Sequence, residues 1–248
     1  MSRYPVPKDY TWSLKIASYD VGQDSRLKLS AQLRMQQEAG ELQFGKGGLG
    51  FEELISNGMA FVITRTNSLI YCPPRLNQHI KLVTWHRCSK GAQFFRCYRF
   101  LDENDQILID SVSAFALVDP ETHKILRPSL FSQYAVTQQP DRFNSCPDPE
   151  KLVSPDGLLP AGGHDVGRSD IDYNGHMNNT IYADIICNTI PAGIRGRRMA
   201  GFTISYLHEA LEGERIGLKT GVSQDEVLVF GETQRGACFE GMVKYNAE

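Results

Sequence analysis

The chain has 248 residues, enough for one large domain or for two small domains of about 120 residues that each bury a core. Its composition, 41% hydrophobic and 22% charged, is ordinary for a soluble globular protein. The formal net charge of -3 gives no electrostatic reason to expect nucleic-acid binding, so an acidic partner would have to meet a local basic patch.

The first half of the chain reads as a short strand, one helix and four more strands. The strand-like stretch covers 11–19, and Ser30 is a suitable N-cap for a helix over 31–44, which the glycines of GKGGLG end. Segments with β-branched, aromatic or alternating residues follow at 59–71, 79–88, 92–102 and 106–119. Prolines then cluster among polar residues up to Pro160, and this texture predicts an extended linker.

The second half repeats the same order. A helix is expected from Asn178 to Ile190, where Pro191 stops it, and four strands are expected at 199–210, 214–223, 226–234 and 238–246. The halves align with Ile80 over Ile216, an offset of 216 − 80 = 136. We therefore predict an α+β protein with domains at 1–128 and 161–248 and a linker at 129–160, each domain a long helix wrapped by a curved antiparallel sheet.

The compartment follows from the cysteines and the N-terminus. The six cysteines form no CxxC pair, which indicates free thiols in a reducing compartment. The N-terminus has no apolar segment typical of a signal peptide, and no run approaches the roughly 18 apolar residues of a membrane span. We expect a cytoplasmic protein that binds neither membrane nor nucleic acid. The histidines have no metal-site spacing and GKGGLG lacks the ending of a phosphate loop, so we expect no metal and no cofactor.

The segment DYNGHMNN gathers several reactive side chains. Asp172, Asn174 and His176 are spaced by two, so in an extended segment they project from one face. Asn178 and Asn179 follow at the start of the predicted helix, whose backbone N–H groups suit a developing oxyanion. These are the parts that thioester hydrolysis needs. The segment is equally compatible with a polar turn that has Asn174-Gly175 at its tip and Asn178 as a helix cap.

Two segments resemble one family. DYNGHMNNTIYADIICNTIP is similar to the D-x-N-x-H-[VM]-N-N-x-x-Y segment of acyl-acyl carrier protein (ACP) thioesterases, which terminate fatty-acid synthesis in plants and bacteria. GFTISYLHEALEGE resembles the family's Tyr-x-x-Glu strand, with Tyr206 and Glu209 at the matching positions. The resemblance covers nearly the whole chain and implies two tandem hotdog domains that hydrolyse fatty acyl-ACP.

The resemblance implies a catalytic set of Asp172, Asn174, His176 and Glu209. Glu209, with His176, would polarise a water, Asn174 would position that water or bind the oxyanion, and Asp172 would orient the segment. Many plant members have a cysteine after the glutamate, where this chain has Ala210. A cysteine nucleophile is therefore not expected, and either Glu209 or His176 can be the base nearer the water.

The first half has Pro73 in the position of Glu209, so we expect one active site per chain. The resemblance gives the first half the acyl pocket. Its candidate residues, each also compatible with ordinary core packing, are Met35, Leu42, Met59, Phe61 and Ile63. The acidic carrier with its phosphopantetheine-linked chain needs a cationic patch, and the candidates, equally compatible with a solvated loop, are Arg195, Arg197 and Arg198.

Other functions remain open at this point. A hotdog acyl-CoA thioesterase would release the same acids from another carrier, and a dehydratase would place its carboxylate differently. A non-enzymatic acyl-binding sensor would use the pocket without needing the polar set. Two fused halves already imitate a hotdog dimer, so the sequence is compatible with a monomer or a homodimer.

Overall fold

The computed structural model describes residues 4–153, 157–194 and 196–246. The chain divides into two compact units, Met1–Pro149 and Glu150–Glu248. Most of the segment expected to be a linker, 129–160, therefore falls in the first unit. No helix in the described ranges is long and apolar enough to cross a membrane.

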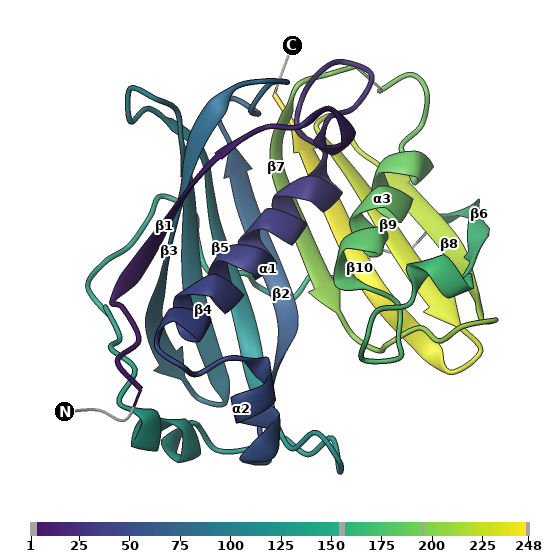
Figure 1. Ribbon diagram of the computed structural model, residues 1–248. Helices are drawn as coiled ribbons and strands as arrows, with labels where there is room; N and C mark the ends of the chain where they lie inside the picture. Colours follow the sequence, from purple (N-terminus) through teal and green to yellow (C-terminus); the bar gives the residue numbers. More distant parts are fainter. Residues whose placement is uncertain (1–3, 154–156, 195, 247–248) are drawn as a thin grey trace. The chain divides into compact units, whose positions relative to one another are not determined.

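The first unit has one long helix lying across a five-stranded antiparallel sheet, followed by a short second helix (Figure 1). Its strands run in the order β1-β3-β4-β5-β2. The elements are β1 (Asp9–Lys15), α1 (Leu29–Lys46), α2 (Phe51–Ser56), β2 (Ala60–Ile70), β3 (His79–Lys90), β4 (Gln93–Leu101) and β5 (Ile107–Val118), with short 3₁₀ turns η1 (Ser18–Asp20) and η2 (Pro128–Tyr134). The four strands predicted after the helix are confirmed, and α1 is longer at both ends than expected. The first strand ends at Lys15, earlier than the predicted 19, because the chain turns at η1.

The start of α1 differs from the expectation. Lys28 occupies the N-cap position without a side-chain cap, and Ser30 lies inside the helix, where its hydroxyl is buried. The helix begins earlier because the backbone N–H of Lys28 is held by the carbonyl of Asp20, 2.9 Å away, which orients the chain before Ser30 is reached.

The outer face of the first sheet is covered by the segment that follows η2. The indole Nε1 of Trp85 donates to the carbonyl of Arg142 at 2.9 Å, and the Asn144 side chain donates to the carbonyls of Tyr98 and Ser111 at 3.0 and 2.9 Å. Part of the proline-rich segment is therefore packed on the sheet. The side-chain hydrogen bonds that hold it come from single residues, which leave no periodic pattern in the sequence.

The second unit repeats the plan with a shorter helix. Its strands run in the order β7-β10-β9-β8-β6. The elements are β6 (Leu159–Asp165), η3 (Arg168–Asp170), α3 (Asn179–Thr189), β7 (Met199–Tyr206), β8 (Arg215–Val222), β9 (Glu226–Thr233) and β10 (Gly236–Tyr245). The helix packs closely on the sheet, since a Cβ at Gly241 would lie 2.3 Å from Cδ1 of Ile186. The predicted α+β architecture is confirmed in both units.

Candidate active site

The segment from Asp172 to His176 is a turn. The N–H of Asp172 donates to the carbonyl of His176 at 3.0 Å, and Gly175 N–H donates to the carbonyl of Asp172 at 3.0 Å. The carboxylate of Asp172 accepts from the N–H of Asn174 at 2.8 Å, and Gly175 has a φ of 84°, in the left-handed region. The extended interpretation is therefore wrong and the turn interpretation is correct: an Asx turn with Asn174-Gly175 at its tip overrides the alternation. Asn174 is exposed, whereas Asp172 and His176 are half-buried.

Asn178 and Asn179 have different roles at the start of α3. Asn178 is the N-cap, and its side-chain oxygen accepts from the N–H and hydroxyl of Thr180 at 2.9 and 2.7 Å. The Asn178 N–H is itself occupied by the carbonyl of Asp170 at 2.8 Å. Among the described residues, none accepts the N–H of Asn179. Of the two expected oxyanion donors, only Asn179 has a backbone N–H to offer.

A backbone hydrogen bond brings the two sequence motifs together. Met177 N–H donates to the carbonyl of Ala210 at 2.8 Å, and Ala210 N–H donates to the Tyr182 hydroxyl at 3.1 Å. His176 and Glu209 each directly precede one of the two joined residues. Within the described ranges, no hydrogen bond links the side chains of Asp172, Asn174, His176 and Glu209 to one another. The backbone bond therefore brings the two motif segments together, without direct hydrogen bonds among these four side chains.

Glu209 lies beyond the end of β7, in the segment before β8, and not on the strand itself. Its side chain is 42% exposed, with one oxygen 3.4 Å from Nη1 of Arg235 and the other 3.6 Å from Nδ1 of His208. Partial burial raises its pKa, but a backbone hydrogen bond and the positive charges of His208 and Arg235 outweigh burial and lower the pKa of Glu209. Glu209 is therefore ionised at neutral pH.

Two residues near this site, Arg235 and His164, are not indicated by the sequence. Arg235, in the turn between β9 and β10, also donates to the carbonyl of Glu209 and binds Glu214 at 2.6 Å. His164 Nε2 lies 2.8 Å from the carboxylate of Asp170, whose carbonyl holds Asn178. An isolated arginine in a turn and a histidine on a short strand carry no motif, so only the tertiary structure reveals them. Tyr206, part of the Tyr-x-x-Glu pattern, donates to the carbonyl of Asn179 at 3.1 Å.

The expected carrier-docking arginines differ in their surroundings. Arg195 lies outside the described residues. Arg197 binds the C-terminal segment, donating to the carbonyls of Gln224 and Asn246 at 2.8 and 2.9 Å and to the carboxylate of Asp225 at 3.1 Å. Arg198 is exposed. Arg197 thus holds the fold locally, and Arg198 is available to a partner.

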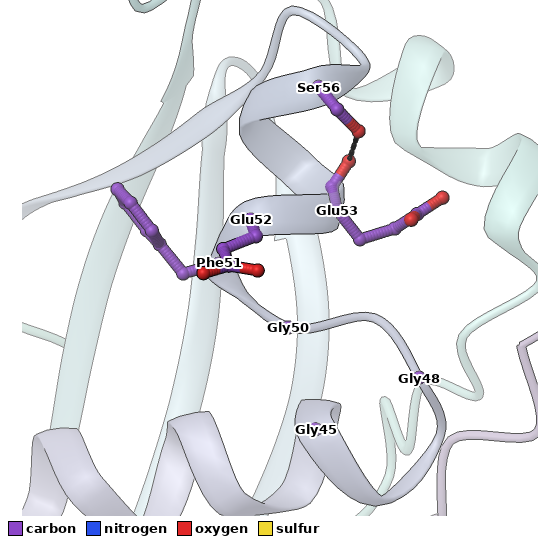
Figure 2. Close-up of a pocket in the computed structure, with 7 residues that line it drawn as sticks. All are labelled: Gly45, Gly48, Gly50, Phe51, Glu52, Glu53 and Ser56. Carbon is purple, nitrogen blue, oxygen red and sulfur yellow. Dashed lines mark hydrogen bonds between the residues drawn. The ribbon is translucent and has the colours of Figure 1, made fainter.

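The expected pocket residues belong to the first unit. Met35 and Met59 are buried, and Leu42, Phe61 and Ile63 are half-buried. Met59 and Phe61 are part of an aromatic cluster that includes Phe44, Phe94 and Phe131. The hollow in Figure 2 is a different place: it lies where α1 leads into α2, and its lining includes Phe51, Glu52, Glu53 and Ser56 but none of the expected residues. Two glutamates make it unsuited to a phosphate group.

Metal chemistry was not expected from the sequence. In the part of the chain that the structure describes, no three His, Cys, Asp or Glu side chains are grouped so that they could hold a metal ion. All six cysteines are free thiols.

Two helix-on-sheet units, one of which carries the polar set, define a tandem hotdog protein with a single candidate site. The family model of the acyl-ACP thioesterase N-terminal domain matches residues 7–129, and that of the C-terminal domain matches residues 162–237. The chain belongs to the acyl-ACP thioesterase family.

Individual relatives are distant in sequence. The chain is 24% identical over 213 residues to dodecanoyl-[acyl-carrier-protein] hydrolase of Cinnamomum camphora, covering 78% of this chain and 54% of that protein. It spans about half the length of the curated relatives it matches. An acyl-ACP thioesterase from Bacteroides thetaiotaomicron superposes with a TM-score of 0.80 at 18% identity, over 96% of this chain and 98% of that one. The 12:0-ACP thioesterase from Umbellularia californica gives 0.78 at 19% identity, over 98% of both chains. These structures share the fold of the whole chain.

Proposed function

We propose that this protein hydrolyses the thioester of fatty acyl-ACP and releases the free fatty acid. The observation that carries the proposal is the hydrogen bond between Met177 and Ala210, which holds the DxNxH turn beside Glu209. Membership of the acyl-ACP thioesterase family supports the same chemistry.

Water is the nucleophile in this proposal. Ala210 has no thiol, and the cysteines of the second unit are poor candidates, because burial raises the pKa of Cys187 to about 12 and that of Cys238 to about 11. Glu209 is ionised and can accept a proton from water, with His176 beside it as the partner that shares or relays this proton. The N–H of Asn179, at the positive end of the α3 dipole, is the proposed donor to the oxyanion.

The test compares two glutamates of one segment. Glu209→Gln keeps the size of the side chain and removes the base, so kcat on acyl-ACP should fall by about 10²-fold or more. Glu212, exposed three residues later, supplies the matched control, because Glu212→Gln makes the same change beside the site. Full activity in Glu209→Gln would refute the general-base role. Faster turnover of acyl-CoA than of acyl-ACP by the unaltered protein would instead favour the acyl-CoA thioesterase alternative.

Carrier docking is a separate part of the proposal. Arg198 is exposed and follows Arg197 before β7, so its charge is available to the acidic carrier. Arg198→Glu should raise KM for acyl-ACP several-fold while sparing short carrier-free thioesters. Arg168 is also exposed but lies in η3, so Arg168→Glu is the matched control and should leave KM unchanged. An equal loss on both kinds of substrate in Arg198→Glu would exclude docking at this residue.

A further inference from the structure

The face of α1 that lies on the first sheet is unexpectedly polar. Gln32, Gln36 and Gln43 are each no more than 2% exposed, and they alternate along the helix with small or apolar residues. Gln32 donates to the hydroxyl of Ser68 at 2.9 Å, and Gln43 donates to the carbonyl of Pro7 at 2.8 Å. A helix buried only for stability presents an apolar stripe to its sheet. The burial of these three glutamines therefore requires an explanation other than core packing.

The sheet residues opposite form a matching polar band. Ser68 donates to the hydroxyl of Ser111 at 2.9 Å, and the hydroxyls of Thr66 and Ser113 are 2.8 Å apart. The band, here called the polar belt, consists of the buried residues Gln32, Gln36, Gln43, Thr66, Ser68, Thr84, His86, Arg96, Ser111 and Ser113. The aromatic cluster that contains Met59 and Phe61 adjoins the belt.

Arg96 is a buried cation without a buried anion. Its Nη1 donates to the side-chain oxygen of Gln43 and to the hydroxyl of Thr84, 3.2 Å away. In the described part of the chain no carboxylate pairs with it. The unit's other enclosed arginines differ: Arg87 pairs with Asp148 at 2.5 Å and Arg99 with Asp110 at 2.7 Å.

Two neutral groups near Arg96 have buried polar atoms without a hydrogen-bond partner among the described residues. Neither amide atom of Gln36 has a hydrogen-bond partner, although Gln36 stands one turn before Gly40, where a Cβ would lie 3.5 Å from Nε of Arg96. His86 pairs with Arg96 across β3 and β4, and its Nδ1 has no partner. Burial and the charge of Arg96 lower the pKa of His86 to about 3, so its ring is neutral. Native proteins satisfy most buried polar groups, so these atoms call for a partner, which a water, an ion or a polar atom of a ligand can supply.

The belt borders the proposed acyl pocket. The Arg96 guanidinium lies 4.8 Å from the ring centre of Phe44, which in turn lies 6.1 Å from the ring of Phe61. An acyl chain that packs against Phe61 and Phe44 meets Arg96 and Gln36 where the aromatic cluster ends. Both offer N–H donors, which recognise oxygen atoms.

We infer that the polar belt binds an oxygen atom carried by the acyl chain, so that the first unit selects hydroxylated, oxo or carboxylate-bearing chains over plain hydrocarbon chains of equal length. This inference rests on the proposed function. A site built to bond a substrate oxygen discriminates strongly against the analogue that lacks it, because its own polar groups are then left unpaired.

The experiment measures kcat/KM on ACP loaded with four chains of one length: plain, hydroxyl-bearing, oxo-bearing and with a terminal carboxylate. The unaltered protein should prefer an oxygenated chain by about tenfold or more. Gln36→Leu should reduce that preference and raise the thermal midpoint, since it removes an unsatisfied buried amide. Arg96→Met should abolish it. Gln37→Leu, the same change on the exposed face of α1, should leave it intact.

Calorimetric titration with the corresponding free acids separates this inference from the proposed function. Tighter binding of an oxygenated acid that Gln36→Leu weakens supports the belt even if no thioester is hydrolysed. A preference for the carboxylate identifies Arg96 as the main contact, and equal preference for hydroxyl and oxo chains identifies Gln36. Equal binding of plain and oxygenated acids by the unaltered protein would overturn the inference, whatever the hydrolytic activity.

Discussion

The turns that precede α1 and α3 have the same backbone and different side chains. In the first, Gly22 N–H donates to the carbonyl of Arg26 at 2.8 Å, as Asp172 does to His176 at 3.0 Å in the second. The N–H of Leu27 binds the carbonyl of Pro74 at 2.8 Å, which matches the bond from Met177 to Ala210. The turns lie 150 residues apart (176 − 26), and the segments they bind lie 136 apart (210 − 74).

The difference between the turns teaches which features the fold requires. Both units need the turn to lead a strand into the helix, so its hydrogen bonds are structural. Gly22, Asp24 and Arg26 occupy the first turn where Asp172, Asn174 and His176 occupy the second, and Pro73 stands where Glu209 does. In the proposed function, the chemistry is carried by only one copy of the repeated scaffold.

The largest expected effect is a loss of activity that is confined to changes in the second turn. His176→Ala should lower kcat by about 10² to 10⁴-fold, because it removes a group that assists proton transfer. Arg26→Ala changes the equivalent position of the first turn and should leave kcat unchanged. The measurement is steady-state hydrolysis of acyl-ACP. Similar losses in the two variants would mean that both turns act only through stability, and the single-site proposal would then fail.

The next largest effect is a difference in stability between changes at the N-caps of α3 and α1. Asn178 caps α3 through its side chain, whereas Lys28 at the start of α1 makes no such bond. Asn178→Ala should therefore cost about 1 kcal/mol of unfolding free energy, which for a chain of this size lowers Tm by about 2–4 °C. Lys28→Ala should leave Tm unchanged. Thermal unfolding measures both Tm values. Equal shifts would show that the side-chain hydrogen bond of Asn178 does not stabilise α3.

Much of the architecture was predictable because strands and helices leave periodic patterns. The four strands of each half, the helix ending before Pro191 and the 136-residue offset all follow from side-chain type and spacing. The catalytic candidates were found as residue types by resemblance. Their arrangement was not, since an Asx turn and an extended strand have similar composition at DYNGH.

The missed features depend on single tertiary contacts. Nothing in the sequence places Arg235 beside Glu209, because the contact joins the β9–β10 turn to the segment after β7. The equivalence of the two turns before the helices was also missed, because G-x-D-x-R does not resemble D-x-N-x-H, although the backbone bonds are the same. The polar face of α1 was overlooked for a similar reason, since glutamines at helical spacing read as a solvated face until the sheet is placed over them.

A smaller effect tests the backbone of the turns. Gly175 and Ser25 hold the same position with φ values of 84° and 60°. A side chain at Gly175 meets no atom within 4 Å, so Gly175→Ser should cost only the conformational strain, about 1 kcal/mol. Ser25→Gly should gain somewhat less, because glycine adds entropy to the unfolded chain. Denaturant unfolding measures both, and the same sign for both changes would refute the equivalence.

The smallest effect is a displacement of the pH profile. Burial raises the pKa of Glu209, but a backbone hydrogen bond and the charges of His208 and Arg235 together lower it below its usual value. A base must be ionised, so activity that depends on Glu209 persists above its lowered pKa and is lost as pH falls through it. Arg235→Gln removes one positive charge and should move the acidic limb of kcat/KM to higher pH. Lys219 pairs with Glu232 on the neighbouring strand. Lys219→Gln is therefore the control, and it should leave the acidic limb of kcat/KM in place. An unmoved limb in Arg235→Gln would assign the titration to another group and remove Glu209 as the base.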